Sequence, residues 1–244
     1  MLDTLLRRRE PVAHLHEQRT RYLARGGIPA PLARLLQTPL PPTTTPLQTL
    51  DILALDIETT GLDPEQDHIL SVGLVPVHQG RIDLRAARRF FVHGPYVVKA
   101  STAIINQITP EMLENGQPLD WVMEELFAVM QGHVLLCHGA TVEQRFINAY
   151  LQQTFGLRDL PLPWLDTLAL ERNRSAHKGA EHNDFRLSSV RARQGLPPYP
   201  AHDALTDAVA TAELLLSLAK TLFADTTPTL GGLLRQQGSF RPLP

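Results

Sequence analysis

Two carboxylates at alternate positions of one apolar stretch could hold a metal ion. Asp56 and Glu58 interrupt an apolar run that begins at Ile52 and has the length of a buried strand. Alternate strand residues share a face, so the two acids lie about 6.5–7 Å apart along the backbone. Acids that meet in a core repel each other unless a cation lies between them, and carboxylate oxygens suit Mg²⁺ and Mn²⁺. The pair therefore predicts a divalent-cation site; the alternative is a strand that simply ends in solvent.

The segment that follows could hold a phosphate. Thr59, Thr60 and Gly61 offer hydroxyls, backbone N–H groups and a flexible turn directly after the two acids.

A third acid and a histidine occur together near the carboxyl end of the chain. Asp207 lies on a predicted helix over 203–222, and His202 directly precedes that helix. The face around Asp207 is made mainly of small residues, so the helix can pack closely on a sheet while one carboxylate points into the interface. Its members are Ala204, Asp207, Ala208, Thr211 and Leu215. Taken singly, His202 could equally be an exposed capping residue and Asp207 a satisfied polar group in the core.

The elements that must position these groups alternate between strands and helices. We expect strands over 51–57, 69–77, 83–92 and 134–138, the first three forming an antiparallel meander. Helices are expected from Thr109, over 118–130 with Trp121 among its core residues, over 187–194 and over 203–222. Another should begin at Thr141, whose spacing to Gln144 fits a capping box. Residues 165–170 form a further strand or a helix start. The fold class is α/β.

Composition indicates a well-cored globular protein with flanking segments. The 244 residues are 43% hydrophobic and 20% charged, with a net charge of −2. We expect an N-terminal helical arm and Pro/Thr-rich linker over 1–49, a main domain over 50–224, and a loosely held tail over 225–244. Cys137 is the only cysteine, and the first residues have the wrong charge order for a secretory signal. A cytoplasmic location and no membrane association are expected.

Two local basic segments could contact partners. Residues 1–50 contain seven arginines, no lysine and three acids. Their helices, expected over 12–24 and 30–37, could contact nucleic acid or another protein, or could pack as a brace on the main domain. The segment 172–186, expected to be a polar loop, offers Arg172, Arg174, Lys178 and Arg186 as contacts for a nucleic-acid backbone. The alternative is an ordinary flexible surface loop.

Taken together, these segments resemble the DEDDh exonucleases, the family of the DNA polymerase III epsilon subunit and oligoribonuclease in the RNase H-like superfamily. The resemblance covers about residues 50–220 and rests on three motifs: Asp56-Ile57-Glu58-Thr59-Thr60-Gly61-Leu62-Asp63-Pro64, His138-Gly139-Ala140-Thr141-Val142-Glu143-Gln144-Arg145-Phe146, and His202-x-Ala204-Leu205-x-Asp207-Ala208. Asn106-Gln107-Ile108-Thr109 and Leu165-Asp166-Thr167-Leu168 are similar to two shorter family segments.

The resemblance implies an RNase H-like fold, with a mixed central sheet flanked by helices, and a metal-dependent 3′→5′ exonuclease. Two Mg²⁺ or Mn²⁺ ions would be held by Asp56, Glu58, Glu143 and Asp207, with Asp56 between them and His202 as the general base. Substrates would be 3′ ends of single-stranded DNA or RNA, and products nucleoside 5′-monophosphates. A polymerase or other protein could bind residues 1–49. The substrate contacts implied are Thr59, Thr60, Gly61, Leu62, Asn106, Ile108, His138 and Phe146.

Several positions depart from the family pattern. Glu143 stands where the family usually has aspartate, and its extra methylene could let it reach the second metal directly; the same acid would also favour the start of a helix without any metal. Gly139, Val142 and Asn106 replace an asparagine, an aromatic residue and a histidine.

Three other functions fit parts of the sequence. A non-catalytic nucleic-acid-binding or polymerase-accessory module would explain Glu143 but not the four retained residues Asp56, Glu58, His202 and Asp207. A scaffold would act through residues 1–50. An HD-type phosphohydrolase is suggested by His202-Asp203, but that chemistry belongs on an all-helical domain, and the strand that carries Asp56 argues against it.

Overall fold

The computed structural model describes residues 11–94, 108–177 and 184–238. The helices are α1 (Pro11–Leu23), α2 (Ala30–Gln37), the 3₁₀ turn η1 (Leu47–Thr49), α4 (Pro110–Glu114), α5 (Leu119–Val129), α6 (Thr141–Phe155), α7 (Thr167–His177), α8 (Leu187–Arg193), α9 (Ala204–Leu222) and α10 (Leu230–Gln236). The strands are β1 (Ile52–Thr59), β2 (Ile69–His78), β3 (Arg81–Ile82), β4 (Arg88–Phe91), β5 (Val134–Cys137) and β6 (Trp164–Asp166).

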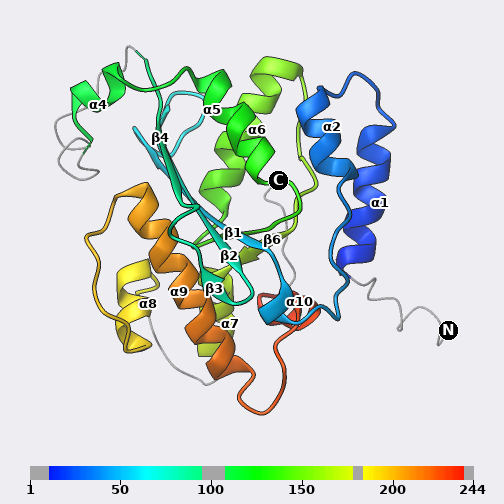
Figure 1. Ribbon diagram of the computed structural model, residues 1–244, viewed down its shortest axis with the longest axis vertical. Coiled ribbons are helices and arrows are strands. Elements are labelled where there is room, and N and C mark those ends of the chain that lie inside the picture. Colours follow the sequence, from blue (N-terminus) through cyan, green and yellow to red (C-terminus); the bar gives the residue numbers. More distant parts are fainter. Residues whose placement is uncertain (1–10, 95–107, 178–183, 239–244) are drawn as a thin grey trace.

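These strands form one mixed sheet between two layers of helices (Figure 1). Its order is β3-β2-β1-β5-β6, and β4 also pairs with β2. β1 runs antiparallel to β2 and parallel to β5, and β5 runs parallel to β6. Helices α5 and α6 cover one face, while α9 lies across the other (Figure 1). The expected α/β class with a mixed, helix-flanked sheet is confirmed.

The alternation along β1 decides which layer each side chain meets. Leu53, Leu55 and Ile57 belong to the core under α5 and α6. Ile52 and Ala54 belong to the core under α9. Asp56 and Glu58 continue this second set by period-2 geometry, so both acids project toward the layer that contains α9.

Helix α9 reaches the sheet at a glycine. Gly73 on β2 pairs directly with Asp56 on β1. A Cβ atom built at Gly73 would lie 2.2 Å from the backbone carbonyl carbon of Ala204 and 2.4 Å from the nitrogen of Leu205. The missing side chain therefore lets the first turn of α9 rest on the backbone of β2, one strand away from Asp56.

The N-terminal helices pack on the domain as a brace. Tyr22 of α1 and Leu32, Leu35 and Leu36 of α2 share a core with residues of α5 and α6. Arg19 is buried, donating to the carbonyl oxygens of Pro161 at 3.0 Å and Thr38 at 2.9 Å. Burial lowers the pKa of Arg19 to about 10. One of the arginines of this basic segment thus has a structural role.

The expectation of a loosely held C-terminal tail is wrong for residues 230–237. Leu230 and Leu233 of α10 are buried in the core under α9. The Gln237 side chain accepts from the backbone N–H of Asp166 at 3.0 Å and donates to the carbonyl of Trp164 at 3.0 Å. This carboxamide satisfies backbone groups of β6, the last strand in the sheet order, as a further strand would. The Gly/Gln-rich composition gave no sign of this long-range pairing.

The third expected strand, 83–92, is interrupted. Asp83 Oδ1 accepts from the backbone N–H of Arg85 at 3.0 Å and of Ala86 at 3.3 Å, which forms a turn between β3 and β4. Trp121 is another correction, because it is 41% exposed and contacts Phe90 edge to face at the surface instead of entering the core.

The expected polar loop over 172–186 is also wrong in part. Helix α7 continues to His177, so Arg172 and Arg174 are helical, while Lys178 lies outside the described residues. Asp166 supports the start of α7 by accepting from the backbone N–H of Leu168 at 2.9 Å. The pair between Glu171 and Arg174, three residues apart, adds support within the helix.

Across the described parts of the chain, we find no helix with the length and apolar character needed to span a bilayer.

The close approach at Gly73 generates a stability prediction. We expect Gly73→Ala to lower the free energy of unfolding by about 1–3 kcal/mol, because the added methyl group would overlap the backbone of Ala204 and Leu205. Urea denaturation measures the change. Ser188→Thr adds one methyl group at an exposed position of α8 and should stay within about 0.5 kcal/mol of the parent. Equal effects of the two variants would contradict the proposed contact.

Candidate active site

Three side chains from two elements converge at the carboxyl end of β1. They are Glu58 of β1, Asp207 of α9 and His202, which precedes α9. Each offers one potential ligand atom, and these atoms lie within 4.8 Å of one another. Glu58 is buried, Asp207 is half-buried and His202 is exposed. The site is therefore open on the side of His202 and closed on the side of the sheet.

The backbone before α9 is held in an unusual conformation. His202 has a φ of 66°, in the left-handed region, and its N–H donates to Oδ2 of Asp207 at 2.9 Å. Asp203 caps α9 by accepting from the N–H of Thr206 at 2.9 Å, and its other oxygen pairs with Arg89 of β4. Burial opposes ionisation of Asp203, but the bonds from Thr206 and the charge of Arg89 outweigh it and lower its pKa.

The proline-rich segment that leads to His202 is anchored by a buried arginine. Arg191 donates to the carbonyls of Ala210 at 2.7 Å and Pro197 at 2.9 Å, and pairs with Glu213 at 2.8 Å. Its guanidinium also stacks 4.7 Å from the centre of the Tyr199 ring. Helices α8 and α9 thus clamp this segment, and fix where the chain enters the site.

Asp56 lies among the other acids. Burial is the main cause that raises its pKa well above its ordinary value, and the charges of Glu143, Asp207 and Glu58 raise it further. The predicted common strand face of Asp56 and Glu58 is consistent with their mutual repulsion.

Glu143 reaches the same region from α6. Its side chain is buried in the first turn of the helix, and Oε2 has no hydrogen-bond partner within the described part of the chain. Burial raises its pKa to about 8, with added repulsion from Asp166 and Glu58, although a backbone hydrogen bond opposes the shift. An acid that only favoured the helix start could lie in solvent, so its burial without a partner favours the ligand interpretation.

The electrostatics of the cluster fit a divalent cation. Burial and repulsion from Asp207 and Asp203 raise the pKa of Glu58 to about 8. Burial also raises the pKa of Asp207, against the hydrogen bond from His202. Carboxylates that resist ionisation together, one of them with an unpartnered oxygen, form the hard oxygen donor set that Mg²⁺ and Mn²⁺ prefer.

The turn after β1 is organised by Asp67. Its carboxylate accepts from the hydroxyl of Thr60 at 2.9 Å and from the N–H of Asp63 at 2.9 Å. It also lies so close to Gly61 that a Cβ atom there would be 2.4 Å away. The Thr59 hydroxyl donates to the carbonyl of Gly61 at 2.6 Å. Leu62 is left 68% exposed at the tip, available to an apolar group of a substrate.

His138 is bound on both sides of its ring. Nε2 lies 2.8 Å from the carbonyl oxygen of Phe185, which can only accept, so Nε2 carries the proton. Nδ1 lies 2.8 Å from the hydroxyl oxygen of Thr167, and that hydroxyl also donates to the carbonyl of Cys137 at 3.2 Å. Burial lowers the pKa of His138, which favours the neutral ring. Both nitrogens thus bind protein groups and neither is free to act on a substrate.

Two other expected substrate contacts, Ile108 and Phe146, are buried. Ile108 is 4% exposed in a small cluster with Leu70 and Leu113. Phe146 is also 4% exposed, within the core under α5 and α6. Asn106 lies outside the described residues. Their roles as substrate contacts remain predictions, and burial leaves Ile108 and Phe146 little surface to offer.

Asp166 supports the turn that carries Glu143. Its carboxylate accepts from the N–H groups of Gly139 at 2.8 Å and Ala140 at 3.3 Å. The expected capping box is wrong: Ala140 occupies the N-cap of α6, no side chain caps the helix, and Gln144 Nε2 is unpartnered within the described part of the chain. The aspartate before Thr167 was a visible helix-start signal, but nothing local indicated that it also holds the preceding strand–helix turn.

Comparison with known proteins identifies relatives of this domain. DNA polymerase III PolC-type of Thermotoga petrophila is 31% identical over 170 residues, or 70% of this chain and 12% of that protein. DNA polymerase III subunit epsilon of Treponema pallidum is 29% identical over 167 residues, 68% of this chain and 74% of that subunit. The chain thus matches about 12% of the length of its PolC-type relative.

Solved structures share the fold at lower identity. Cell-death related nuclease 4 superposes with a TM-score of 0.61 at 14% identity, covering 71% of this chain and 65% of that one. E. coli Exonuclease I in complex with a dA16 oligonucleotide gives 0.60 at 18% identity, covering 71% and 41%. The RNase H-like fold expected from the sequence is confirmed.

The family model described as Exonuclease, RNase_T, matches residues 53–215. This range contains the four carboxylates of the cluster and His202. The chain therefore belongs to the RNase_T family of exonucleases.

Proposed function

We propose that this exonuclease removes nucleotides from the 3′ end of single-stranded DNA or RNA and releases nucleoside 5′-monophosphates. The observation that carries the proposal is the approach of Glu58, His202 and Asp207 to within 4.8 Å at an open end of the sheet, beside Asp56 and the buried Glu143. The complex of Exonuclease I with dA16 supports a single-stranded substrate for this fold.

Four carboxylates would hold two divalent cations, Mg²⁺ or Mn²⁺: Asp56, Glu58, Glu143 and Asp207. When bound, such ions act as Lewis acids that stabilise negative charge on a phosphodiester. The protein contributes a rigid frame, since β1, α6 and α9 each fix one part of the donor set.

His202 is the proposed general base. It is exposed at the mouth of the site, and a ring nitrogen lies within 4.8 Å of oxygens of Glu58 and Asp207, so the imidazole can reach a water molecule next to these carboxylates. Accepting one proton from that water would generate the nucleophile that attacks the terminal phosphorus, and the 3′ oxygen of the preceding nucleotide would leave. Exposed Leu62 would contact the terminal base while the turn at 59–61 lies beside its phosphate.

The relatives that are polymerase components support a polymerase as the protein partner. The exposed side of α1, which includes Arg21, is the surface of residues 1–49 proposed for that contact.

Cleavage of end-labelled strands tests the reaction. Incubation of 5′-labelled DNA and RNA single strands with Mg²⁺ or Mn²⁺ should give a ladder that shortens from the 3′ end. Chelator should abolish the ladder, and so should Asp56→Asn, which removes a charge while keeping the shape of the side chain. Absence of cleavage under all conditions, with strand binding intact, would instead indicate a non-catalytic binding module.

Glu143 variants test the departure from aspartate. Glu143→Gln should lower kcat at least about 100-fold, because it removes the charge of a direct metal ligand rather than of an outer partner. Glu143→Asp keeps the charge but withdraws it by one methylene, so the loss should be smaller. Glu124→Gln, an exposed change on α5, is the matched control and should leave kcat unchanged. Wild-type activity of Glu143→Gln would remove Glu143 from the site.

The raised pKa values predict how stability depends on pH and metal. Glu58 and Glu143 have pKa values of about 8 in the fold, against about 4.3 for glutamate in an unfolded chain. The folded state therefore binds their protons more tightly, and this stabilisation is complete below about pH 4 and is lost as the pH rises through about 8.

In chelator, the melting temperature should therefore fall between about pH 5 and about pH 8, and fall less in Glu58→Gln and Glu143→Gln. Mg²⁺ or Mn²⁺ should raise it more at the higher pH, where the ligands ionise at smaller cost. Identical pH profiles for the parent and both variants, with no effect of metal, would contradict the proposed cluster.

A further inference from the structure

A second feature lies beside the carboxylate cluster. A hollow of about 420 Å³ is lined by His138, Leu168, Arg172, Asp184, Phe185 and Arg186. The lining contains two guanidinium groups, of Arg172 and Arg186, and one carboxylate, of Asp184. None of these residues supplies a ligand to the proposed metal site.

Strand register places the hollow next to the site. β1 and β5 run parallel, with Ala54 paired to Leu136, and His138 directly follows β5, so it lies at the same carboxyl end of the sheet as Asp56. Cys137 pairs in turn with Asp166 of β6, directly before α7. Neighbouring strands are about 4.8 Å apart, so the hollow continues the site along the carboxyl edge of the sheet.

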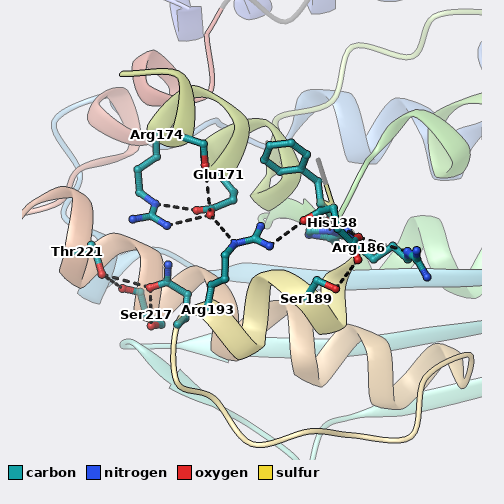
Figure 2. A network of polar contacts seen from close by, with 12 residues as sticks. His138, Glu171, Arg174, Arg186, Ser189, Arg193, Ser217 and Thr221 are labelled. Atoms are coloured by element: carbon teal, nitrogen blue, oxygen red, sulfur yellow. Dashed lines mark hydrogen bonds and ion pairs between the residues drawn. The ribbon is translucent and has the colours of Figure 1, made fainter. Parts of the chain in front are cut away.

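Buried polar contacts hold the rim of the hollow in place (Figure 2). Glu171 is fully buried, bonded to Arg174 at 2.7 and 2.9 Å and paired with Arg193 at 3.5 Å. Arg193 also donates to the carbonyl of Asp184 at 2.8 Å. The carbonyl of Phe185 then accepts from His138. A chain of contacts thus joins α7, α8 and the strand end that precedes Glu143.

The arginines on the rim differ in how they are neutralised. Arg174 is paired with Glu171, and Arg186 lies 3.3 Å from Asp184 while remaining 84% exposed. Arg172 stacks 5.5 Å from the centre of the Phe185 ring, and within the described chain it has no carboxylate partner. A guanidinium held against an aromatic ring and lacking an acid is suited to bind an anion, above all a phosphate.

We propose that this hollow binds a phosphate of the nucleic-acid strand on the 5′ side of the bond that is cut, with Arg172 as the main contact and Arg186 as the second. The inference rests on the proposed function, because the same strand must place its 3′ end at the carboxylates. It predicts that substrates long enough to reach the hollow bind better than a dinucleotide.

Binding to catalytically silent protein tests the inference directly. In an Asp56→Asn background, fluorescence anisotropy with labelled dT10 and rU10 would compare Arg172→Gln, Arg186→Gln and the double variant with the unaltered rim. We expect Arg172→Gln to weaken binding of both strands about tenfold, the range for a hydrogen bond to a charged group. The slope of log affinity against log salt should become shallower by about 0.7, as for one lost contact to a single strand.

Two controls separate this contact from general effects. Arg81→Gln removes an exposed arginine on β3, at the opposite edge of the sheet, and should leave affinity and slope unchanged. Arg172→Lys should recover part of the affinity, because it restores the charge but not the planar donor pair. Melting temperatures close to that of the parent would show that each variant is folded.

Steady-state cleavage then distinguishes the two proposals. In the active enzyme, Arg172→Gln should raise KM for a ten-residue strand about tenfold with little change in kcat, and should not alter cleavage of a dinucleotide. Normal cleavage by the parent with no effect of Arg172→Gln beyond that of Arg81→Gln would overturn the subsite and leave the exonuclease intact. Strand binding that depends on Arg172, in a protein without any nuclease activity, would support the phosphate subsite and overturn the proposed exonuclease reaction.

Discussion

Repulsion among buried carboxylates is the interaction on which the functional end of this molecule depends. Asp56, Glu58, Glu143 and Asp207 all have raised pKa values, with burial as the largest cause and neighbouring acids adding to it in each case. Such a cluster costs stability unless protons or cations neutralise it. The packed sheet and helices offset this cost and hold the four acids at one end of the sheet, where we propose that metal ions and a phosphodiester bind. Under this proposal, the same electrostatics link stability, metal binding and chemistry.

The position of the four acids depends on strand β1 and on the close packing of α9 against the sheet. The period of β1 sends its apolar residues alternately into the two cores, and the two acids continue the row that faces α9. Gly73 then removes the side chain that would otherwise keep α9 away from the sheet. Beyond the site, Arg191 and Arg89 fix the segment and the cap around His202. Each of these contacts joins two elements that are separate in the sequence, and together they fix where the carboxylates and His202 lie.

A second set of contacts joins the cluster to the far edge of the sheet. Asp166 holds both the turn that leads to Glu143 and the start of α7, while Gln237 of the C-terminal segment satisfies the backbone around Asp166. His138 and Phe185 extend the same framework to α8. The proposed phosphate subsite lies on this framework, so the residues that position a metal ligand would also position the incoming strand. Substrate length and metal binding would then act on one connected part of the structure.

The sequence by itself determined the acids, their shared strand face, the small-residue face of α9 and the α/β class, because these follow from the local periods of two and 3.6 residues. It also indicated the family through three separated motifs. Only the tertiary structure decided that Glu143 is buried without a partner, that His138 is occupied on both nitrogens, and that residues 230–237 complete the sheet edge. Those features depend on contacts between residues far apart in the chain, such as Gln237 with Trp164 and His138 with Phe185, which no local pattern encodes.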